Sequence, residues 1–160
     1  MIFGKRLSEY VAFCKPFLVL VPAIGLTRLA LSLAGVSNST TRWLSMTALV
    51  WIAVLIYSVR MHTRRFGTYK HLLVVCALLN WTAQAIAITG IIIAIATGTN
   101  NVFSSPEFAF GSDGKTWSHL AAHLFIGTTA GSIIPWLIGS LILLLARKVD
   151  QSGSHVKSVA

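Results

Sequence analysis

The fold is decided by residues 71–96, "HLLVVCALLNWTAQAIAITGIIIAIA", which contain no Asp, Glu, Lys or Arg. A helix needs about 20 apolar residues to cross about 30 Å of hydrocarbon, so this stretch is long enough to span a membrane. Three further apolar runs lie at 17–36, 43–59 and 119–146. The sequence therefore predicts an all-α integral membrane protein, built as an antiparallel four-helix transmembrane bundle.

Composition and charge agree with a membrane protein. Of the 160 residues, 55% are hydrophobic and 11% are charged, whereas soluble domains contain about 25% charged residues. The net charge of +9 comes mainly from 1–16, 60–70 and 147–157, which four crossings place on one side, while the other side carries only Arg42 and Lys115. The positive-inside rule then puts both termini in the cytoplasm, and anionic lipid explains the charge without nucleic acid. We expect a multi-pass protein of a bacterial inner membrane.

The segments outside the four runs suggest how the chain is organised. Residues 1–149 are predicted to form one transmembrane domain, whose start, 1–16, has the mixed character of a short amphipathic helix at the lipid headgroups. Residues 150–160 are predicted to be a disordered cytoplasmic tail. The loop 97–116 is long, and long loops are commonly functional. We expect this loop to fold over the outer end of the bundle, because it contains three aromatic residues that need burial, Phe103, Phe108 and Phe110.

Four basic or amide side chains lie inside the apolar runs: Arg28, Asn80, Gln84 and His123. Such groups are costly at membrane depth, so each one asks for a structural or functional explanation. Asn80 and Gln84 are one helical turn apart and share a face, which is typical of contacts between helices but also of a ligand site. Arg28 either pairs structurally or holds an anionic group. We predict that the four residues line a site for a lipid-like or quinone-like ligand in the outer half of the bundle.

His119 and His123 are also one turn apart, on the same face as Gly127 and Gly131, which predicts that they point inward. Three interpretations are open. The histidines tie the loop to the helix by hydrogen bonds, or they bind a metal ion together with Glu107, or one of them ligates haem b. The full zinc-protease motif is absent, since Leu120 follows His119 where a glutamate is needed.

No nucleophile and base occur at a recognisable spacing, and no glycine-rich phosphate loop is present. The leading prediction is therefore a non-enzymatic protein that is either an accessory subunit of a membrane complex or a binder of a small ligand. Its expected partners are membrane lipids and other transmembrane subunits or further copies of itself. The alternative is a redox or metal-binding membrane protein that uses His119, His123 and Glu107.

Overall fold

The computed structural model describes residues 1–109 and 113–157. Within these residues the chain is helical and contains no strand, which confirms the predicted all-α class. Four helices are long and apolar enough to cross a membrane, as the four runs predicted. They are α1 (Leu7–Leu33), α3 (Met46–Thr63), α4 (Tyr69–Thr97) and a last helix made of α5 (Trp117–Ala121), η2 (Ala122–Gly127) and α6 (Thr128–Lys157). Two short helices, α2 (Asn38–Thr41) and η1 (Pro106–Phe108), lie in the connections.

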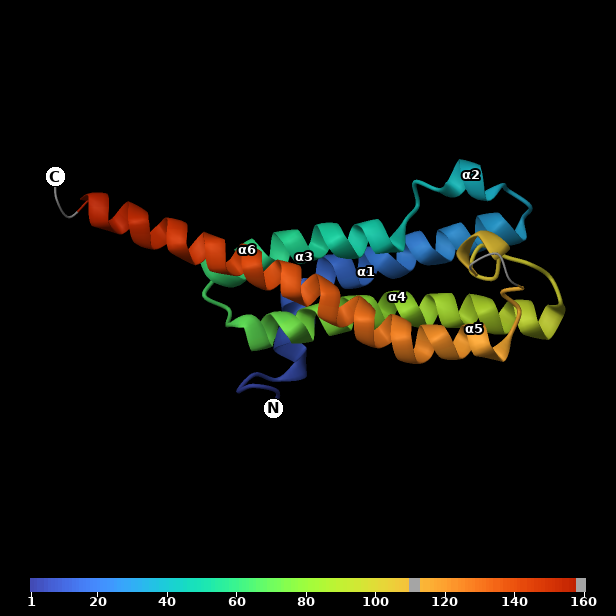
Figure 1. Ribbon diagram of the computed structural model, residues 1–160, viewed down its shortest axis with the longest axis horizontal. Helices are drawn as coiled ribbons and strands as arrows, with labels where there is room; N and C mark the ends of the chain where they lie inside the picture. Colours follow the sequence, from blue (N-terminus) through green and yellow to red (C-terminus); the bar gives the residue numbers. More distant parts are fainter. Residues whose placement is uncertain (110–112, 158–160) are drawn as a thin grey trace.

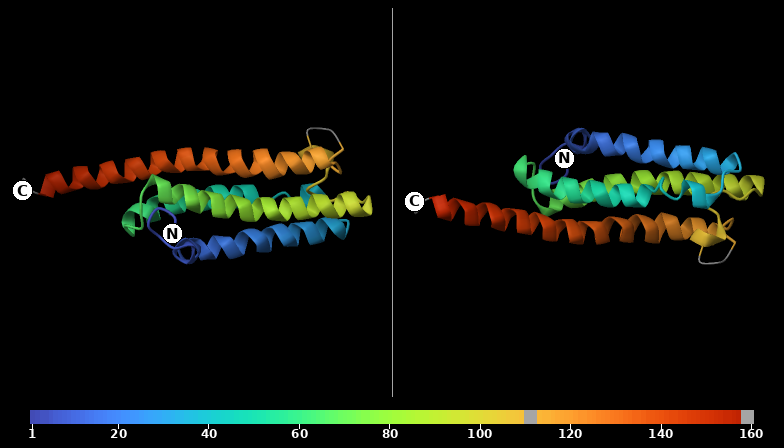
Figure 2. Two further views of the ribbon diagram at one scale, coloured as in Figure 1. Left: turned by 90° about the horizontal axis from the view of Figure 1, so that it is seen from below. Right: turned by 90° about the horizontal axis from the view of Figure 1, so that it is seen from above.

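The long helices run antiparallel to one another in chain order, so the start of α1 and the end of α6 lie at the same end of the bundle (Figure 1). We call the opposite end, where α1 and α4 finish, the loop end. In the two views of Figure 2, α1 and α6 lie on opposite sides of a middle layer formed by α3 and α4. In the described part of the chain, the backbones of α1 and α6 do not approach each other closely, whereas the backbone of α4 lies close to each of the other three long helices.

The N-terminal segment differs from the prediction, because 7–16 is not a separate amphipathic helix but the beginning of α1. The backbone N–H of Arg6 donates to Oε2 of Glu9 at 2.7 Å, and this cap fixes the start of the helix. Pro16 lies inside α1 and does not break it. Prolines are tolerated within transmembrane helices because neighbouring groups satisfy the freed carbonyl groups.

The last helix also extends beyond its predicted end. The apolar run was expected to end at 146 and a disordered tail to begin at 150, yet α6 continues to Lys157. Residues 158–160 lie outside the described part of the chain. The continuation has a local reason, since Arg147, Lys148 and Gln151 favour helix and no proline follows to stop it.

The core is built around α4, whose small and polar residues meet glycines of the last helix. A Cβ atom added at Gly127 would lie 2.9 Å from Oε1 of Gln84, and one added at Gly131 would lie 2.5 Å from Oδ1 of Asn80. These two positions therefore admit only glycine without movement of the amide side chains. The predicted close-packing face of the last helix is thus present, and it packs on the polar stripe of α4.

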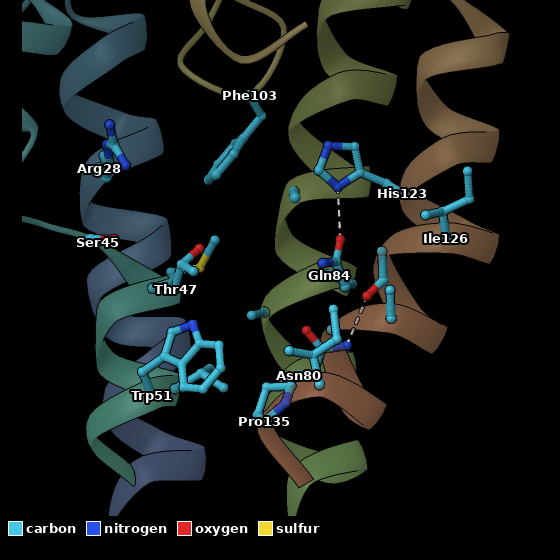
Figure 3. Close-up of a pocket in the computed structure, with 18 of the residues that line it drawn as sticks. Arg28, Ser45, Thr47, Trp51, Asn80, Gln84, Phe103, His123, Ile126 and Pro135 are labelled. Atoms are coloured by element: carbon cyan, nitrogen blue, oxygen red, sulfur yellow. Dashed lines mark hydrogen bonds between the residues drawn. The ribbon is translucent and has the colours of Figure 1, made fainter. Parts of the chain in front are cut away.

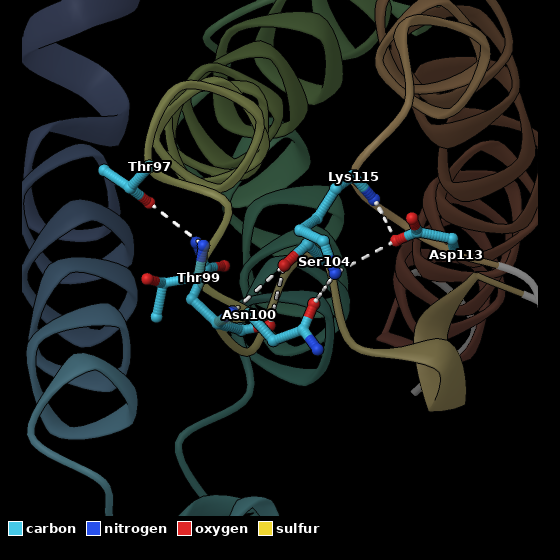
Figure 4. A network of polar contacts seen from close by, with 7 residues as sticks. Thr97, Thr99, Asn100, Ser104, Asp113 and Lys115 are labelled. Atoms are coloured by element: carbon cyan, nitrogen blue, oxygen red, sulfur yellow. Dashed lines mark hydrogen bonds and ion pairs between the residues drawn. The ribbon is translucent and has the colours of Figure 1, made fainter.

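The first part of the connection, 98–109, folds back onto α4. The side-chain amide of Asn101 donates to the carbonyl oxygen of Gly90 at 2.6 Å, which anchors the loop within the last two turns of that helix. The Lys115 ammonium lies 2.7 Å from Oδ1 of Asn100 and 3.3 Å from Oδ1 of Asp113 (Figure 4). The backbone N–H of Lys115 and this ammonium lower the pKa of the Asp113 carboxyl.

Phe103 packs into the space left by a glycine of α4, because a Cβ at Gly90 would lie 2.5 Å from Cδ2 of its ring. The ring of Phe103 is therefore partly buried, as we expected for an aromatic residue of this loop. The side chain of Phe108 and the whole of Phe110 lie outside the part of the chain that the structure describes.

Candidate functional site

A cavity of about 470 Å³ lies in the loop-end half of the bundle, with α1 and α3 on one side and α4, η2 and α6 on the other (Figure 3). This volume falls in the range of about 300–1,000 Å³ that small-molecule sites occupy. The four predicted ligand-binding residues, Arg28, Asn80, Gln84 and His123, all line it. The structure therefore brings to one cavity residues from three helices that are far apart in the sequence.

The orientation of Asn80 is fixed by the last helix. Its amide nitrogen Nδ2 lies 3.0 Å from the carbonyl oxygen of Gly127, 3.1 Å from that of Thr128 and 3.2 Å from Oγ of Ser132. Carbonyl oxygens only accept hydrogen bonds, so the nitrogen of the amide must face them. Oδ1 of Asn80 consequently lies on the other side of the amide, close to Gly131 and facing the cavity (Figure 3).

Gln84 is held one turn further along α4 by His123. Nδ1 of His123 lies 2.7 Å from Oε1 of Gln84, and because this oxygen is an acceptor, Nδ1 carries the proton. The amide nitrogen of Gln84 then faces the cavity, as Figure 3 shows. The wall formed by α4 therefore presents an acceptor from Asn80 and a donor from Gln84, each held by a contact with the last helix.

His123 reaches Gln84 from an irregular turn. Residues 122–127 form a π-helix, in which the backbone N–H of Thr128 donates to the carbonyl oxygen of His123, five residues earlier. Single π-helical turns inside α-helices occur frequently at functional sites. The sequence contained no signal for this turn, since a π-helix has no characteristic residue pattern.

His119 lies outside the cavity lining, at the contact between the last helix and the loop. Its Nε2 lies 3.2 Å from the carbonyl oxygen of Phe103, so this nitrogen carries the proton. The rings of His119 and His123 meet edge to face, with centroids 4.9 Å apart. This arrangement matches the hydrogen-bonding interpretation, in which the first histidine ties the loop to the helix.

Arg28 comes to the cavity from α1 and is half-buried. The carboxylate of Glu107 interacts electrostatically with its guanidinium group. Oε2 of Glu107 also accepts a hydrogen bond from the side chain of Asn38 at 3.5 Å. Glu107 therefore lies with Arg28 and Asn38, and the structure does not bring it together with the two histidines.

The described residues assemble neither three ligands for a metal ion nor two facing histidines for haem. Among the described residues no group of three or more His, Cys, Asp or Glu side chains could hold a metal ion, whereas zinc sites use three or four protein ligands. For haem held by two histidines, the rings must face each other from different helices. His62 and His71 lie at the junction of α3 and α4, at the opposite end of the bundle from His119 and His123.

The apolar part of the cavity was not predicted. Trp51 of α3, Phe103 of the loop and Pro135 of α6 form much of its wall. Only Trp51 gave a possible signal, because a tryptophan in the middle of a crossing lies away from the interface, where this residue is enriched. At the rim, Ile126 and Ile134 are 67% and 51% exposed, so the cavity wall reaches the surface of the bundle at apolar residues.

No family model matches this chain, and neither a curated protein nor a solved structure matches it.

Proposed function

We propose that this chain is a small, non-enzymatic protein of a bacterial inner membrane that binds a lipid-like or quinone-like molecule in the cavity between α3, α4 and α6. The observation that carries the proposal is the convergence of Arg28, Asn80, Gln84 and His123 on one hollow of ligand size. Small-molecule sites combine a mostly apolar wall with a few fixed polar groups, and this cavity has both.

The charge distribution supports the orientation in which both termini are cytoplasmic. The turn between α3 and α4 contains Arg64 and Arg65, and Lys70 lies in the first turn of α4, whereas the loop end has Arg42 and Lys115. Under the positive-inside rule the loop end then faces outward. The cavity consequently belongs to the outer half of the membrane, and its apolar rim at Ile126 and Ile134 faces hydrocarbon. A ligand reaches it sideways from the bilayer.

The cavity favours ligand binding over a purely accessory role. A subunit that only packs against other subunits needs complementary surfaces and gains nothing from an internal hollow with oriented amides. Polar groups in a hydrocarbon environment cost free energy unless they find partners. A bound molecule supplies such partners to the cavity-facing atoms of Asn80 and Gln84.

The proposal is tested by extracting the purified protein and identifying small molecules by mass spectrometry. Ala83 lies on the cavity wall and is 8% exposed, so Ala83→Leu places a larger side chain where the ligand would lie. Ala85, two positions along α4, is exposed on the outside, which makes Ala85→Leu the matched control. We expect an apolar molecule in stoichiometric amount in the unaltered protein and the control, and its loss in Ala83→Leu. Equal ligand content in both variants, or no ligand in any sample, contradicts the proposal.

A further inference from the structure

The side-chain oxygen of Asn80, which lines the cavity, is a hydrogen-bond acceptor that cannot turn away. Asn80 is 6% exposed, and both N–H groups of its amide are engaged by oxygen atoms of the last helix. Rotating the amide would place Oδ1 against two carbonyl oxygens. No group in the described part of the chain donates a hydrogen bond to Oδ1, which faces the cavity (Figure 3). A ligand that fills the space must therefore bring a donor to this atom, or leave a buried acceptor unsatisfied.

Gln84 and Arg28 add hydrogen-bond donors to the cavity, beside the hydroxyl groups of Ser45 and Thr47, which can donate or accept. The amide nitrogen of Gln84 faces the same space one turn nearer to the loop end, and the guanidinium of Arg28 lines the wall formed by α1. A matching ligand thus carries an O–H or N–H group and, separated from it, an oxygen atom that accepts. Trp51 and Phe103 add flat aromatic surfaces to the wall, which suit a planar ring.

From this pattern, and resting on the proposed function, we infer that the cavity binds the reduced, hydroquinone form of an alkylated quinone-type ring in preference to the oxidised form. A ring hydroxyl of the hydroquinone donates to Oδ1 of Asn80, while its other oxygen accepts from Gln84. The oxidised quinone has two carbonyl oxygens and no donor. It satisfies Gln84 but sets an acceptor against the acceptor of Asn80.

The test uses three probes with the same ring and the same decyl chain: a benzohydroquinone, the corresponding benzoquinone and the dimethyl ether of the hydroquinone. Their dissociation constants are measured by calorimetry with the whole protein in detergent, without oxygen. Because leaving a buried acceptor unsatisfied costs more free energy than a typical hydrogen bond contributes, we expect the hydroquinone to bind at least about tenfold more tightly than either analogue.

Two variants assign the preference to Asn80. Asn80→Leu keeps a side chain of similar size but removes the acceptor, and we expect the three probes to bind with nearly equal affinity. Ser132→Ala removes one of the oxygens that hold Nδ2 and leaves Oδ1 in place, so this control should keep the preference. Should Asn80→Leu fail to fold, the comparison of the three probes on the unaltered protein still decides the inference.

The outcomes separate the inference from the proposed function. Binding of all three probes with equal affinity, or tighter binding of the quinone, overturns the inference and leaves the proposed function standing. A hydroquinone preference that persists in Asn80→Leu also overturns it, because another group then supplies the acceptor. If none of the three probes binds, while mass spectrometry finds another apolar ligand that Ala83→Leu removes, the inference alone fails. If neither measurement finds a ligand, both fail.

Discussion

The contact between Gly131 and Asn80 leads to a quantitative prediction about stability. In Gly131→Ala the new methyl group would lie 2.5 Å from Oδ1 and 2.8 Å from Nδ2 of Asn80, so the amide or the helix must move. Overpacking of this kind costs about 1–3 kcal/mol, the weakened hydrogen bonds add roughly 1 kcal/mol, and the better helix propensity of alanine offsets about 1 kcal/mol. We expect a net loss of about 2 kcal/mol in the free energy of unfolding.

Asn80→Ala removes three contacts with oxygens of the last helix, at 3.0, 3.1 and 3.2 Å. Interhelical hydrogen bonds in membranes average about 0.6 kcal/mol, so this variant should lose about 2 kcal/mol. The double variant escapes the steric clash, because the amide that the methyl group would strike is gone. It should lose only about 1 kcal/mol, since the alanine at 131 still improves helix propensity. The two substitutions are therefore predicted to be strongly non-additive.

The assay is reversible unfolding of the purified protein in mixed micelles, followed by circular dichroism. Gly139→Ala is the control, because a Cβ there would lie 2.6 Å from Oγ of Ser58 and would not touch Asn80. Gly139→Ala and Asn80→Ala should add, within about 0.5 kcal/mol. Additivity of Gly131→Ala and Asn80→Ala within the same margin would refute the packing that we describe between α4 and the last helix.

Three further predictions concern the loop, the histidines and the orientation. Asn101→Ala removes a buried hydrogen bond to Gly90 and should lower the free energy of unfolding by about 1–3 kcal/mol. Lys115→Ala, at the exposed ion pair, should lower it by less than about 1 kcal/mol. Thermal unfolding measures both variants, and a larger loss for Lys115→Ala than for Asn101→Ala would contradict this prediction. The protein should retain no stoichiometric metal after dialysis and show no Soret band, because only two histidines meet at the loop end of the described chain. One metal ion per chain that is lost in His119→Ala and His123→Ala would instead support the metal-binding interpretation. In intact cells an impermeant maleimide should label Asp113→Cys but not Arg64→Cys. The natural cysteines, Cys14 and Cys76, are buried and should not react. Labelling of Arg64→Cys alone would show that the topology is the opposite of the one proposed.

The four crossings could be predicted because a long apolar run leaves few alternatives to a helix. Where α1 begins could not, since Pro16 suggested a break and nothing in the periodicity showed that a membrane helix would tolerate it. Where α6 ends could not be predicted either, because a polar composition after 146 is compatible with both a helix and a disordered tail.

The residues of the candidate site could be predicted from the sequence, but the contacts between them could not. Polar groups at membrane depth are few, so Arg28, Asn80, Gln84 and His123 could be picked out one by one. The position of Glu107 depends on the path of a loop, which no periodic pattern records, and the structure places it beside Asn38 rather than the histidines. The π-turn that aims His123 at Gln84 was equally hidden from the sequence.

For the polar stripe of α4 the sequence left two interpretations open, a packing face or a ligand site, and Asn80 shows why they are compatible. Its nitrogen bonds the last helix and thereby fixes the direction of its oxygen. Gly131 allows the close approach that this bond needs. An amide that made no contact with the helix could rotate to suit either a donor or an acceptor on a ligand. Because packing removes that freedom, we predict that the residue that joins the two helices also selects the chemical group that the cavity binds.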